Sequence, residues 1–395
     1  MESSFKTKLP NLGTSIFTEM SMMASQYKAI NLSQGFPEFD VPEFLKSEIK
    51  QAIADGKNQY CPSTGLPELL KQIGDLIHRK YQKDGFAEDL INGMQNVTVT
   101  SGATEALWVA IQTIVRSGDE VIVFDPAYDS YEPAVELAGG SCRHISLNAP
   151  NYSVNWDLVE QAINNNTRAI IINSPHNPTG TLLSKSDLET LQKLVIKHNL
   201  YVISDEVYEY MTFDGMRHES VLAYPELFKR AFVVSSFGKT FHCTGWKLGY
   251  CVAPLDLTVE FRKIHQYVTF CSFTPAQFAI ASMLKTHPNH IDELAEFYQQ
   301  KRDLLVDALG NSRFKVLPSK GTYFLLLDYS VISDLNDLEF CHWLTQEIGV
   351  AAIPLSPFYQ TDKLAEYHKS NKVVRLCFAK NDETLLKAAE ILCKL

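Results

Sequence analysis

The sequence lacks several features that would assign it at once to a class of protein. It has no apolar run that approaches the length of a membrane span, and its first residues, MESSFKTKLP, contain no apolar signal core. It has no basic tract, and its formal net charge is −10. We therefore expect binding neither to a membrane nor to nucleic acid.

Metal-binding and nucleotide-binding motifs are also missing. The eight cysteines are scattered, with no Cys-x-x-Cys pair and no Cys/His cluster at zinc spacing, which predicts reduced thiols in the cytoplasm and no metal site. Gly238-Lys239-Thr240 looks like the end of a phosphate-binding P-loop. That motif requires a glycine where Val233 stands, so the nucleotide interpretation is excluded.

What the sequence does contain is a repeated pattern of strand, loop and helix from Asn96 onward. Such alternation predicts an α/β fold, in which a mainly parallel sheet is covered by helices. After about Pro275 the pattern changes to that of a smaller α+β domain. We expect an N-terminal segment, residues 1–44, to pack with this small domain (residues 286–395), and residues 45–285 to form the large domain.

Lys239 is the residue around which the functional hypothesis is built. It follows the apolar run Ala231 to Val234, which reads as a buried strand. Partial burial would lower the pKa of its ammonium group and free the amine to form a Schiff base with an aldehyde. Taken alone, a lysine after a strand is more often a solvated loop residue.

Other strand ends carry polar residues, and ligands of open α/β sheets bind at the carboxyl ends of the strands. Ser101-Gly-Ala-Thr, between a strand and a helix, is a ready anion site or merely a helix cap. Tyr128 could lie against a planar ring or in the core. Asn177, held between two prolines, suits a bond to a ligand oxygen or a turn.

The remaining candidates supply charge. Asp205 ends a strand and could pair with a protonated ring nitrogen or cap a helix, with Tyr208 within reach of the same side. Ser236 and Lys247 flank Lys239 and offer a hydroxyl and a cation to a phosphate. Arg375 interrupts an apolar strand and should meet an acidic group, from the protein or from a substrate.

Together these residues describe the site of a flat, phosphorylated heteroaromatic aldehyde held beside a lysine, which is pyridoxal 5'-phosphate. The chain resembles the class I aminotransferases of the fold-type I pyridoxal-phosphate superfamily, in the branch of the methionine, glutamine-phenylpyruvate and kynurenine aminotransferases. The resemblance runs from Leu9-Pro-Asn-Leu-Gly-Thr through Ile30-Asn-Leu-Ser-Gln-Gly-Phe-Pro to Arg375-Leu-Cys-Phe-Ala-Lys. Its specific motifs are Pro175-His-Asn-Pro-Thr-Gly, Ser204-Asp-Glu-Val-Tyr and Ser236-Phe-Gly-Lys-Thr.

The resemblance implies a role for each candidate. Lys239 would bind the cofactor covalently and move the proton, and Asp205 would hold the pyridinium proton. Tyr208 and Asn177 would bond the ring oxygen, and Tyr128 would stack on the ring.

The phosphate would be held by the backbone of Ala103 and Thr104, by Ser236, and by Lys247, where many relatives have arginine. Tyr60 would reach the phosphate of a neighbouring subunit, which implies a homodimer with shared active sites.

Substrate choice follows from the same comparison. Arg375, with Asn177 and the Gly35 backbone, would bind the α-carboxylate. No second arginine is marked out for a distal carboxylate. Phe17, Phe270 and Phe273 would form an apolar pocket for methionine or an aromatic side chain, although ordinary core packing explains them as well. His176 is interpreted as a loop residue that maintains geometry.

The expected activity is therefore ping-pong transfer of an amino group from methionine or an aromatic amino acid to a 2-oxo acid. Several alternatives remain open from the sequence. The same site could serve as a cysteine-S-conjugate β-lyase or a kynurenine or glutamine transaminase. The fold could also belong to a cofactor-sensing regulator, although no DNA-binding module precedes it, or to a cofactor-free binding protein.

Overall fold

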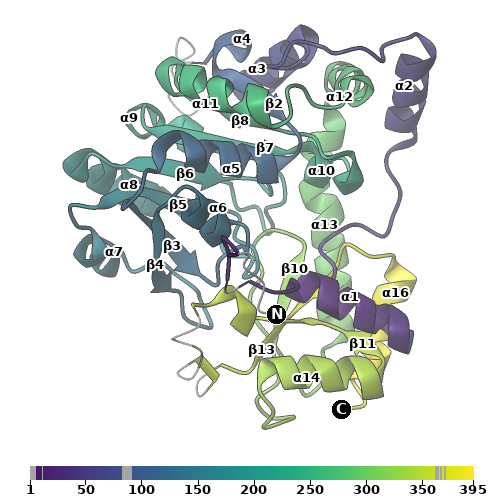
Figure 1. Ribbon diagram of the computed structural model, residues 1–395. Helices are drawn as coiled ribbons and strands as arrows, with labels where there is room; N and C mark the ends of the chain where they lie inside the picture. The colour runs from purple at the N-terminus through teal and green to yellow at the C-terminus, as the bar shows by residue number, and fades with distance from the viewer. Residues whose placement is uncertain (1–5, 11, 82–90, 361–363, 365–366, 369–370) are drawn as a thin grey trace.

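A computed structural model describes residues 6–10, 12–81, 91–360, 364, 367–368 and 371–395. It contains a large sheet at the upper left of Figure 1 and a smaller one at the lower right. The long helix α13 (Asn289–Ala308) runs from the helices that flank the large sheet down to the smaller sheet. Both described ends of the chain lie beside the smaller sheet.

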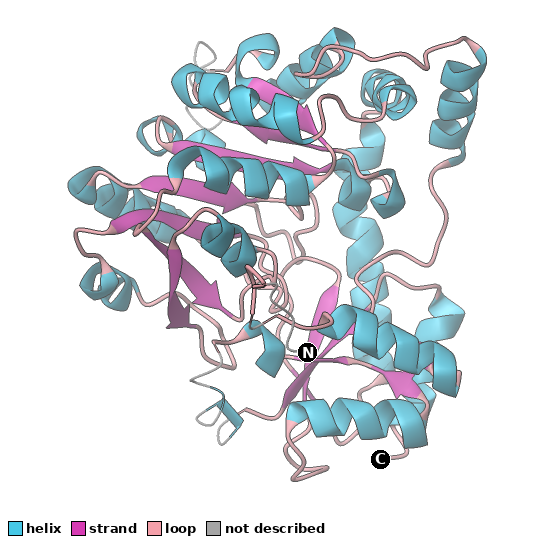
Figure 2. Cartoon of the chain, in the orientation of Figure 1, coloured by secondary structure: helices cyan, strands magenta, loops and turns pink. Residues whose placement is uncertain are grey.

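The large sheet has seven strands, and six of them run in one direction. The exception is β8 (Gly249–Val252), which is antiparallel to both of its neighbours. At one edge of the sheet β2 (Val97–Thr100) pairs with β8. On the other side of β8 follow, in spatial order, β7 (Ala231–Ser236), β6 (Tyr201–Asp205), β5 (Thr167–Asn173), β3 (Glu120–Asp125) and β4 (Ser141–Ser146). The carboxyl ends of the six parallel strands consequently meet at one edge (Figure 2).

Both faces of this sheet are buried, because successive side chains of each central strand point to opposite faces. Val121 and Val123 of β3 pack in one apolar cluster, and Ile122 and Phe124 pack in another. The first cluster includes residues of α5 (Ala103–Ile114), α6 (Tyr131–Leu137) and α11 (Leu255–Val268). The second includes residues of α2 (Glu43–Ala54), α3 (Pro67–Tyr81), α7 (Trp156–Ala162), α8 (Lys185–His198), α9 (Pro225–Phe228), α10 (Phe237–Thr240) and α12 (Thr274–Thr286).

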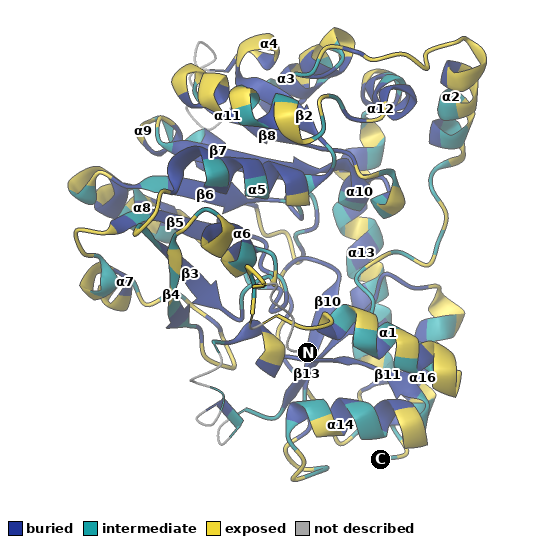
Figure 3. Ribbon diagram, viewed as in Figure 1, coloured by how far each residue is buried: buried dark blue, intermediate teal, exposed yellow. Residues whose placement is uncertain are grey.

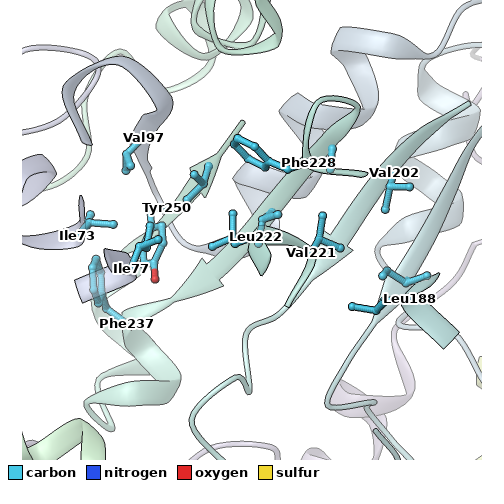
Figure 4. Packing of buried hydrophobic residues seen from close by; sticks show 14 of the residues in the cluster. Ile73, Ile77, Val97, Leu188, Val202, Val221, Leu222, Phe228, Phe237 and Tyr250 are labelled. Atoms are coloured by element: carbon cyan, nitrogen blue, oxygen red, sulfur yellow. The ribbon is translucent and has the colours of Figure 1, made fainter. Parts of the chain in front are cut away.

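Figure 4 shows the second cluster from close by. Ile73 and Ile77 of α3 lie one helical turn apart and face Tyr250 of β8, while Phe237 packs from the chain just before Lys239. In Figure 3 the central strands of the large sheet, such as β6, β7 and β8, are dark blue, and most of the exposed residues lie on the outer helices and loops. The turn that carries Lys239 is therefore anchored on a buried core.

The smaller sheet has four strands, β12 (Ile353–Pro354), β13 (Val373–Cys377), β10 (Phe324–Asp328) and β9 (Lys315–Val316). It is antiparallel throughout. Its apolar cluster also takes in residues of α13 and of the helices α1 (Ile16–Tyr27), α14 (Asp337–Trp343) and α16 (Asp382–Leu392). The short helix α4 (Gly93–Asn96) leads into β2.

The N-terminal segment is tied to this smaller unit by main-chain bonds. The strand β1 (Ile30–Asn31) pairs in parallel with β11 (Val350–Ala351). Farther along, Leu32 donates to Ala351 and accepts from Cys377. These contacts support our proposal that residues 1–44 belong with residues 286–395, and that residues 45–285 form the large domain.

Candidate active site

A cavity of about 200 Å³ lies where the strand ends of the large sheet face the smaller sheet. Most of the residues expected to act together line it. They are Phe17, Gly35, Ala103, Thr104, Tyr128, Asn177, Asp205, Tyr208, Ser236, Lys239, Lys247 and Arg375. Residues more than 350 positions apart in the sequence thus share one enclosed space.

Lys239 enters the cavity from the short helix α10, directly after β7. Its Nζ donates a 2.7 Å hydrogen bond to Tyr323 Oη and a 3.2 Å bond to the Gly35 carbonyl. Burial lowers the pKa of the Lys239 ammonium to about 8. Near neutral pH about a tenth of this amine is therefore unprotonated, far more than for an ordinary lysine, and a nucleophile or a general base requires this form.

Asp205 is the last residue of β6 and is almost completely buried. Its Oδ2 accepts a 2.7 Å bond from Tyr131 Oη, and its Oδ1 accepts a 3.3 Å bond from the Val207 amide. Burial raises the pKa of Asp205 to about 6, although the bond from Tyr131 favours the charged form. The cavity thus holds a carboxylate that a cationic group would stabilise.

An anion cradle, formed by Gly102, Ala103, Thr104, Ser236 and Lys247, lies at the N-terminus of α5. No side chain caps this 12-residue helix, whose first amides have no partner within the helix. Its N-cap Gly102 has a φ of 81°, and a β-carbon added there would lie 3.3 Å from Lys247 Nζ. Helix amides, a hydroxyl and an ammonium group therefore line the same cavity, a combination that suits a phosphate.

Arg375 lies in the middle of β13, where it is opposite Leu326 of β10, and it is fully buried. Nη1 donates a 2.9 Å bond to Asn177 Oδ1, and Nη2 donates a 3.0 Å bond to the Ser33 carbonyl. Nε has no hydrogen-bond partner among the described residues. The guanidinium lies 3.9 Å from the ring centroid of Phe324, which favours the cation and fixes its plane.

Two tyrosines give the cavity flat walls. Tyr208 packs edge-on against Tyr323 at 5.2 Å between ring centroids, and burial raises the pKa of its phenol. The Tyr128 ring meets that of Tyr131 edge-on at 5.6 Å, and burial raises the pKa of Tyr128 as well. Both phenols stay neutral and can donate a hydrogen bond at ordinary pH.

Other residues singled out in the sequence lie outside the cavity. Tyr60 is 81% exposed, and its ring packs edge-on against Phe270, which is 49% exposed, at 5.1 Å. Phe273 is 52% exposed. Within one chain Phe270 and Phe273 therefore do not join Phe17 in a substrate pocket. His176 is buried beside a second cavity, where its Nδ1 pairs with Thr179 Oγ1 at 2.7 Å.

Three residues with direct contacts to the site were missed in the sequence. Tyr131 bonds Asp205, Asn173 bonds the backbone of both Asp205 and Asn177, and Tyr323 bonds Lys239. Asn173 is the last residue of β5, and Tyr131 opens α6 after the loop that follows β3, so the strand-end rule that found their neighbours would have found them. Tyr323 precedes a strand of the smaller sheet and carries no such signal.

The sequence profile of the class I and II aminotransferases matches residues 27–392. The chain belongs to this family. It is 51% identical over 390 residues to the methionine aminotransferase of Escherichia coli K12, covering 99% of this chain and 98% of that protein. It is 36% identical to the kynurenine–oxoglutarate transaminase of Dictyostelium discoideum, over 98% of this chain and 95% of the relative.

A solved structure supports the same family. The E. coli protein YbdL, identified as a methionine aminotransferase, superposes with a TM-score of 0.94 at 50% identity, with 99% of each chain covered. The fold is thus that of the fold-type I aminotransferases, and the protein is an aminotransferase. No helix in the described ranges is long and apolar enough to cross a membrane. Those ranges also contain no group of three His, Cys, Asp or Glu residues placed to hold a metal ion.

Proposed function

We propose that this aminotransferase uses pyridoxal 5'-phosphate to move the amino group of methionine or an aromatic amino acid to a 2-oxo acid. The observation that carries the proposal is the shared cavity, which joins a lysine of lowered pKa, a buried carboxylate, an anion cradle and a buried arginine. The relatives named methionine aminotransferase and kynurenine–oxoglutarate transaminase support the substrate class.

The residues fit the cofactor from both ends. The anion cradle suits its phosphate. The buried Asp205 carboxylate, to which no cation among the described residues is bonded, suits a protonated ring nitrogen. Tyr128 would cover the ring, while Tyr208 and Asn177 would bond its oxygen. When bound, the cofactor supplies an electron sink for the charge that develops at the substrate Cα. The amine of Lys239 lies in the same cavity to hold it covalently.

Arg375 would bind the substrate, and Lys239 would transfer the proton. Arg375 would bind the substrate α-carboxylate, and its unpartnered Nε and the adjacent Asn177 amide leave donors for this purpose. This contact would set the direction of the Cα–H bond. Lys239, released by the substrate amine, would take the Cα proton on Nζ as a general base and return it as a general acid.

The composition of the cavity supports an apolar substrate side chain. Phe17, Leu107, Val207 and Phe324 contribute apolar walls. Among the described lining residues Arg375 is the one arginine, so a second carboxylate would find no bidentate partner there. A kynurenine or glutamine donor fits the same site, and the 36% identical relative favours kynurenine as the second candidate.

The assembly we propose is a homodimer of the cytoplasm. The exposed aromatic pair Tyr60 and Phe270 lies outside the cavity of its own chain. We propose that Tyr60 reaches the phosphate in a second copy of the chain, with Phe270 beside the substrate there. All eight cysteines are free thiols, which fits a reducing compartment.

A donor and acceptor screen tests the function. Purified protein with pyridoxal 5'-phosphate would receive methionine, phenylalanine, tyrosine, kynurenine, glutamine or aspartate, each with several 2-oxo acids. We expect methionine and the aromatic donors to have the highest kcat/KM and aspartate the lowest. Release of pyruvate and ammonia from a cysteine S-conjugate, faster than amino transfer, would instead identify a β-lyase. Absence of transfer from every donor would overturn the proposal.

A further inference from the structure

Tyr323 is bonded to Lys239, yet none of the roles assigned above uses it. It is fully buried in the loop before β10. Its Oη donates a 2.5 Å bond to the Gly35 carbonyl and receives the 2.7 Å bond from Lys239 Nζ. A carbonyl oxygen can only accept, so the single phenol proton is directed to Gly35 and the oxygen lone pair faces Lys239.

The ring of Tyr323 has little freedom to move. Its neighbours are Tyr208, Tyr298 and Phe324, whose ring centroids lie 5.2, 5.7 and 4.9 Å away. Burial raises the pKa of the Tyr323 phenol well above its ordinary value, so it remains neutral. The phenol is thus a fixed acceptor that neither gains nor loses charge.

We propose that Tyr323 is a positioning residue for Lys239, whose amine it holds against the Gly35 carbonyl and whose ammonium form it stabilises. This inference rests on the proton-transfer role proposed for Lys239. During that transfer the proton moves between the substrate Cα and Lys239 Nζ. The phenol keeps its own proton, which stays in the hydrogen bond to the Gly35 carbonyl. Two acceptors fix two N–H directions, which leaves the remaining direction of Nζ for the proton in transit.

The acceptors around Lys239 act against burial and the nearby cations, and in the same direction as Asp205 and Cys377, which raise the pKa of the Lys239 ammonium. Titratable groups face it from three parts of the chain. They are Asp205 and Tyr208 at and after the end of β6, Lys247 after the turn η3 (Thr244–Trp246), and Arg375 and Cys377 of β13. Burial and the two cations favour the neutral amine. Tyr323 favours the ammonium, so its loss should make Lys239 give up its proton at a lower pH.

The test uses cofactor-free protein, so that it does not depend on activity. Trace acetic anhydride labels unprotonated amines, and mass spectrometry of the Lys239 peptide across pH values gives the midpoint of its titration. We expect Tyr323→Phe, which keeps the ring but removes the acceptor, to lower this midpoint by roughly one pH unit. An unchanged midpoint would overturn the proposal.

Tyr298→Phe is the matched control. Tyr298 is a buried tyrosine of the same aromatic group, but its hydroxyl pairs with His242 Nδ1 at 3.0 Å instead of Lys239. The substitution Tyr298→Phe should therefore leave the pH midpoint of the Lys239 titration unchanged. An equal shift in both variants would show that packing is responsible and would reject the specific role of Tyr323.

A second substitution covers the case in which Tyr323→Phe does not fold. Site-specific replacement of Tyr323 by 3-fluorotyrosine keeps the hydroxyl but makes its oxygen a weaker acceptor, so the midpoint should fall by a smaller amount. No fall would again reject the proposal. Failure of the donor screen would reject the proposed function, whereas the labelling midpoint separately tests the contact between Tyr323 and Lys239.

Discussion

Tyr131 donates its phenol proton to Asp205 across a 2.7 Å hydrogen bond, and both residues are buried. Asp205 ends β6, and Tyr131 opens α6 on one face of the same sheet. The bond fixes the carboxylate but brings no positive charge to it. The charged form of Asp205 is therefore disfavoured in the cofactor-free protein, since burial has removed the water that would solvate its charge.

Asp205→Asn should stabilise the cofactor-free protein at alkaline pH. The folded pKa of Asp205, about 6, lies above the ordinary pKa of 3.8 for this group, so between these pH values the folded state retains a proton that the unfolded chain releases. The associated stability is present at low pH and is lost as pH rises through 6. At pH 8 the substitution should gain at most roughly 3 kcal/mol, and at pH 4 little.

Melting temperatures of cofactor-free wild type and variant at pH 4 and pH 8 measure this difference. Asp157→Asn, at an exposed position in the first turn of α7, is the control and should show no pH-dependent gain. A gain for Asp205→Asn that is the same at both pH values would contradict the argument. The same variant should bind pyridoxal 5'-phosphate more weakly, because it lacks the carboxylate proposed for the ring nitrogen.

Lys239→Ala should abolish amino transfer, because it removes both the proposed covalent attachment and the proton carrier. Borohydride reduction followed by peptide mass analysis should show the cofactor on the Lys239 peptide of the wild type and on no peptide of the variant. Lys193→Ala changes an exposed lysine of α8 and should behave like wild type. Turnover that survives Lys239→Ala would refute the assignment.

Arg375→Lys should raise KM for the amino acid and the 2-oxo acid far more than it lowers kcat. A lysine keeps the positive charge but cannot make the two parallel hydrogen bonds of a guanidinium to a carboxylate. The loss should therefore be about 2–4 kcal/mol of carboxylate binding, or roughly 30–1,000-fold in kcat/KM. Steady-state kinetics with both substrates provide the measurement. A KM equal to that of the wild type would mean that Arg375 serves only its buried contacts with Asn177 and Ser33.

Two inactive variants should restore activity to each other if Tyr60 acts across a dimer. Tyr60→Ala and Lys239→Ala would be unfolded and refolded together, or co-expressed. In a mixed dimer, one site has the intact Lys239 of one subunit and the intact Tyr60 of the other. With random pairing, activity should recover to about a quarter of the wild-type value. No recovery, in samples shown by sedimentation to contain mixed dimers, would place Tyr60 in its own subunit's site.

Lys247→Met should weaken retention of the cofactor by removing the cation beside Gly102. Because Lys247 is exposed and offers a single charge, the expected loss is modest, about tenfold in affinity. Equilibrium dialysis at low and high salt would measure it, and the difference between variant and wild type should shrink at high salt. A cofactor affinity unaffected by the substitution would exclude Lys247 from the anion cradle.

Much of this fold could be read from the sequence because its periodic segments are long. The spacing of apolar residues predicts helices from about Pro67 to Tyr81 and from about Lys185 to His198, and the helices of the structure have these bounds. The buried strand before Lys239 is also present, two residues longer than expected. Strands at the edge of a sheet were harder to predict from the sequence. The strand β4 was missed because it alternates exposed and half-buried residues in a polar stretch, SCRHIS, without an apolar run.

Some residues of the candidate site could likewise be predicted from the sequence, and others could not. Residues at the carboxyl ends of parallel strands, such as Asp205, follow a rule that holds for any sheet of this kind. Arg375 was found because a charge inside an apolar strand requires a partner. Tyr323 follows neither rule, since its role depends on how the smaller sheet is placed against the larger one. That placement comes from tertiary packing, which no local pattern encodes.

The short ladder between β1 and β11 links the two halves of the cavity in an unexpected way. Ser33 and Gly35 follow that ladder directly, so the carbonyls bonded to Arg375 and to Lys239 lie on one ribbon fastened to the smaller sheet. A shearing displacement of that sheet would carry Ser33 along with Arg375 but pull Gly35 away from Lys239. Such a displacement would release Lys239 from one of its two acceptors while it left the contact between Arg375 and Ser33 intact.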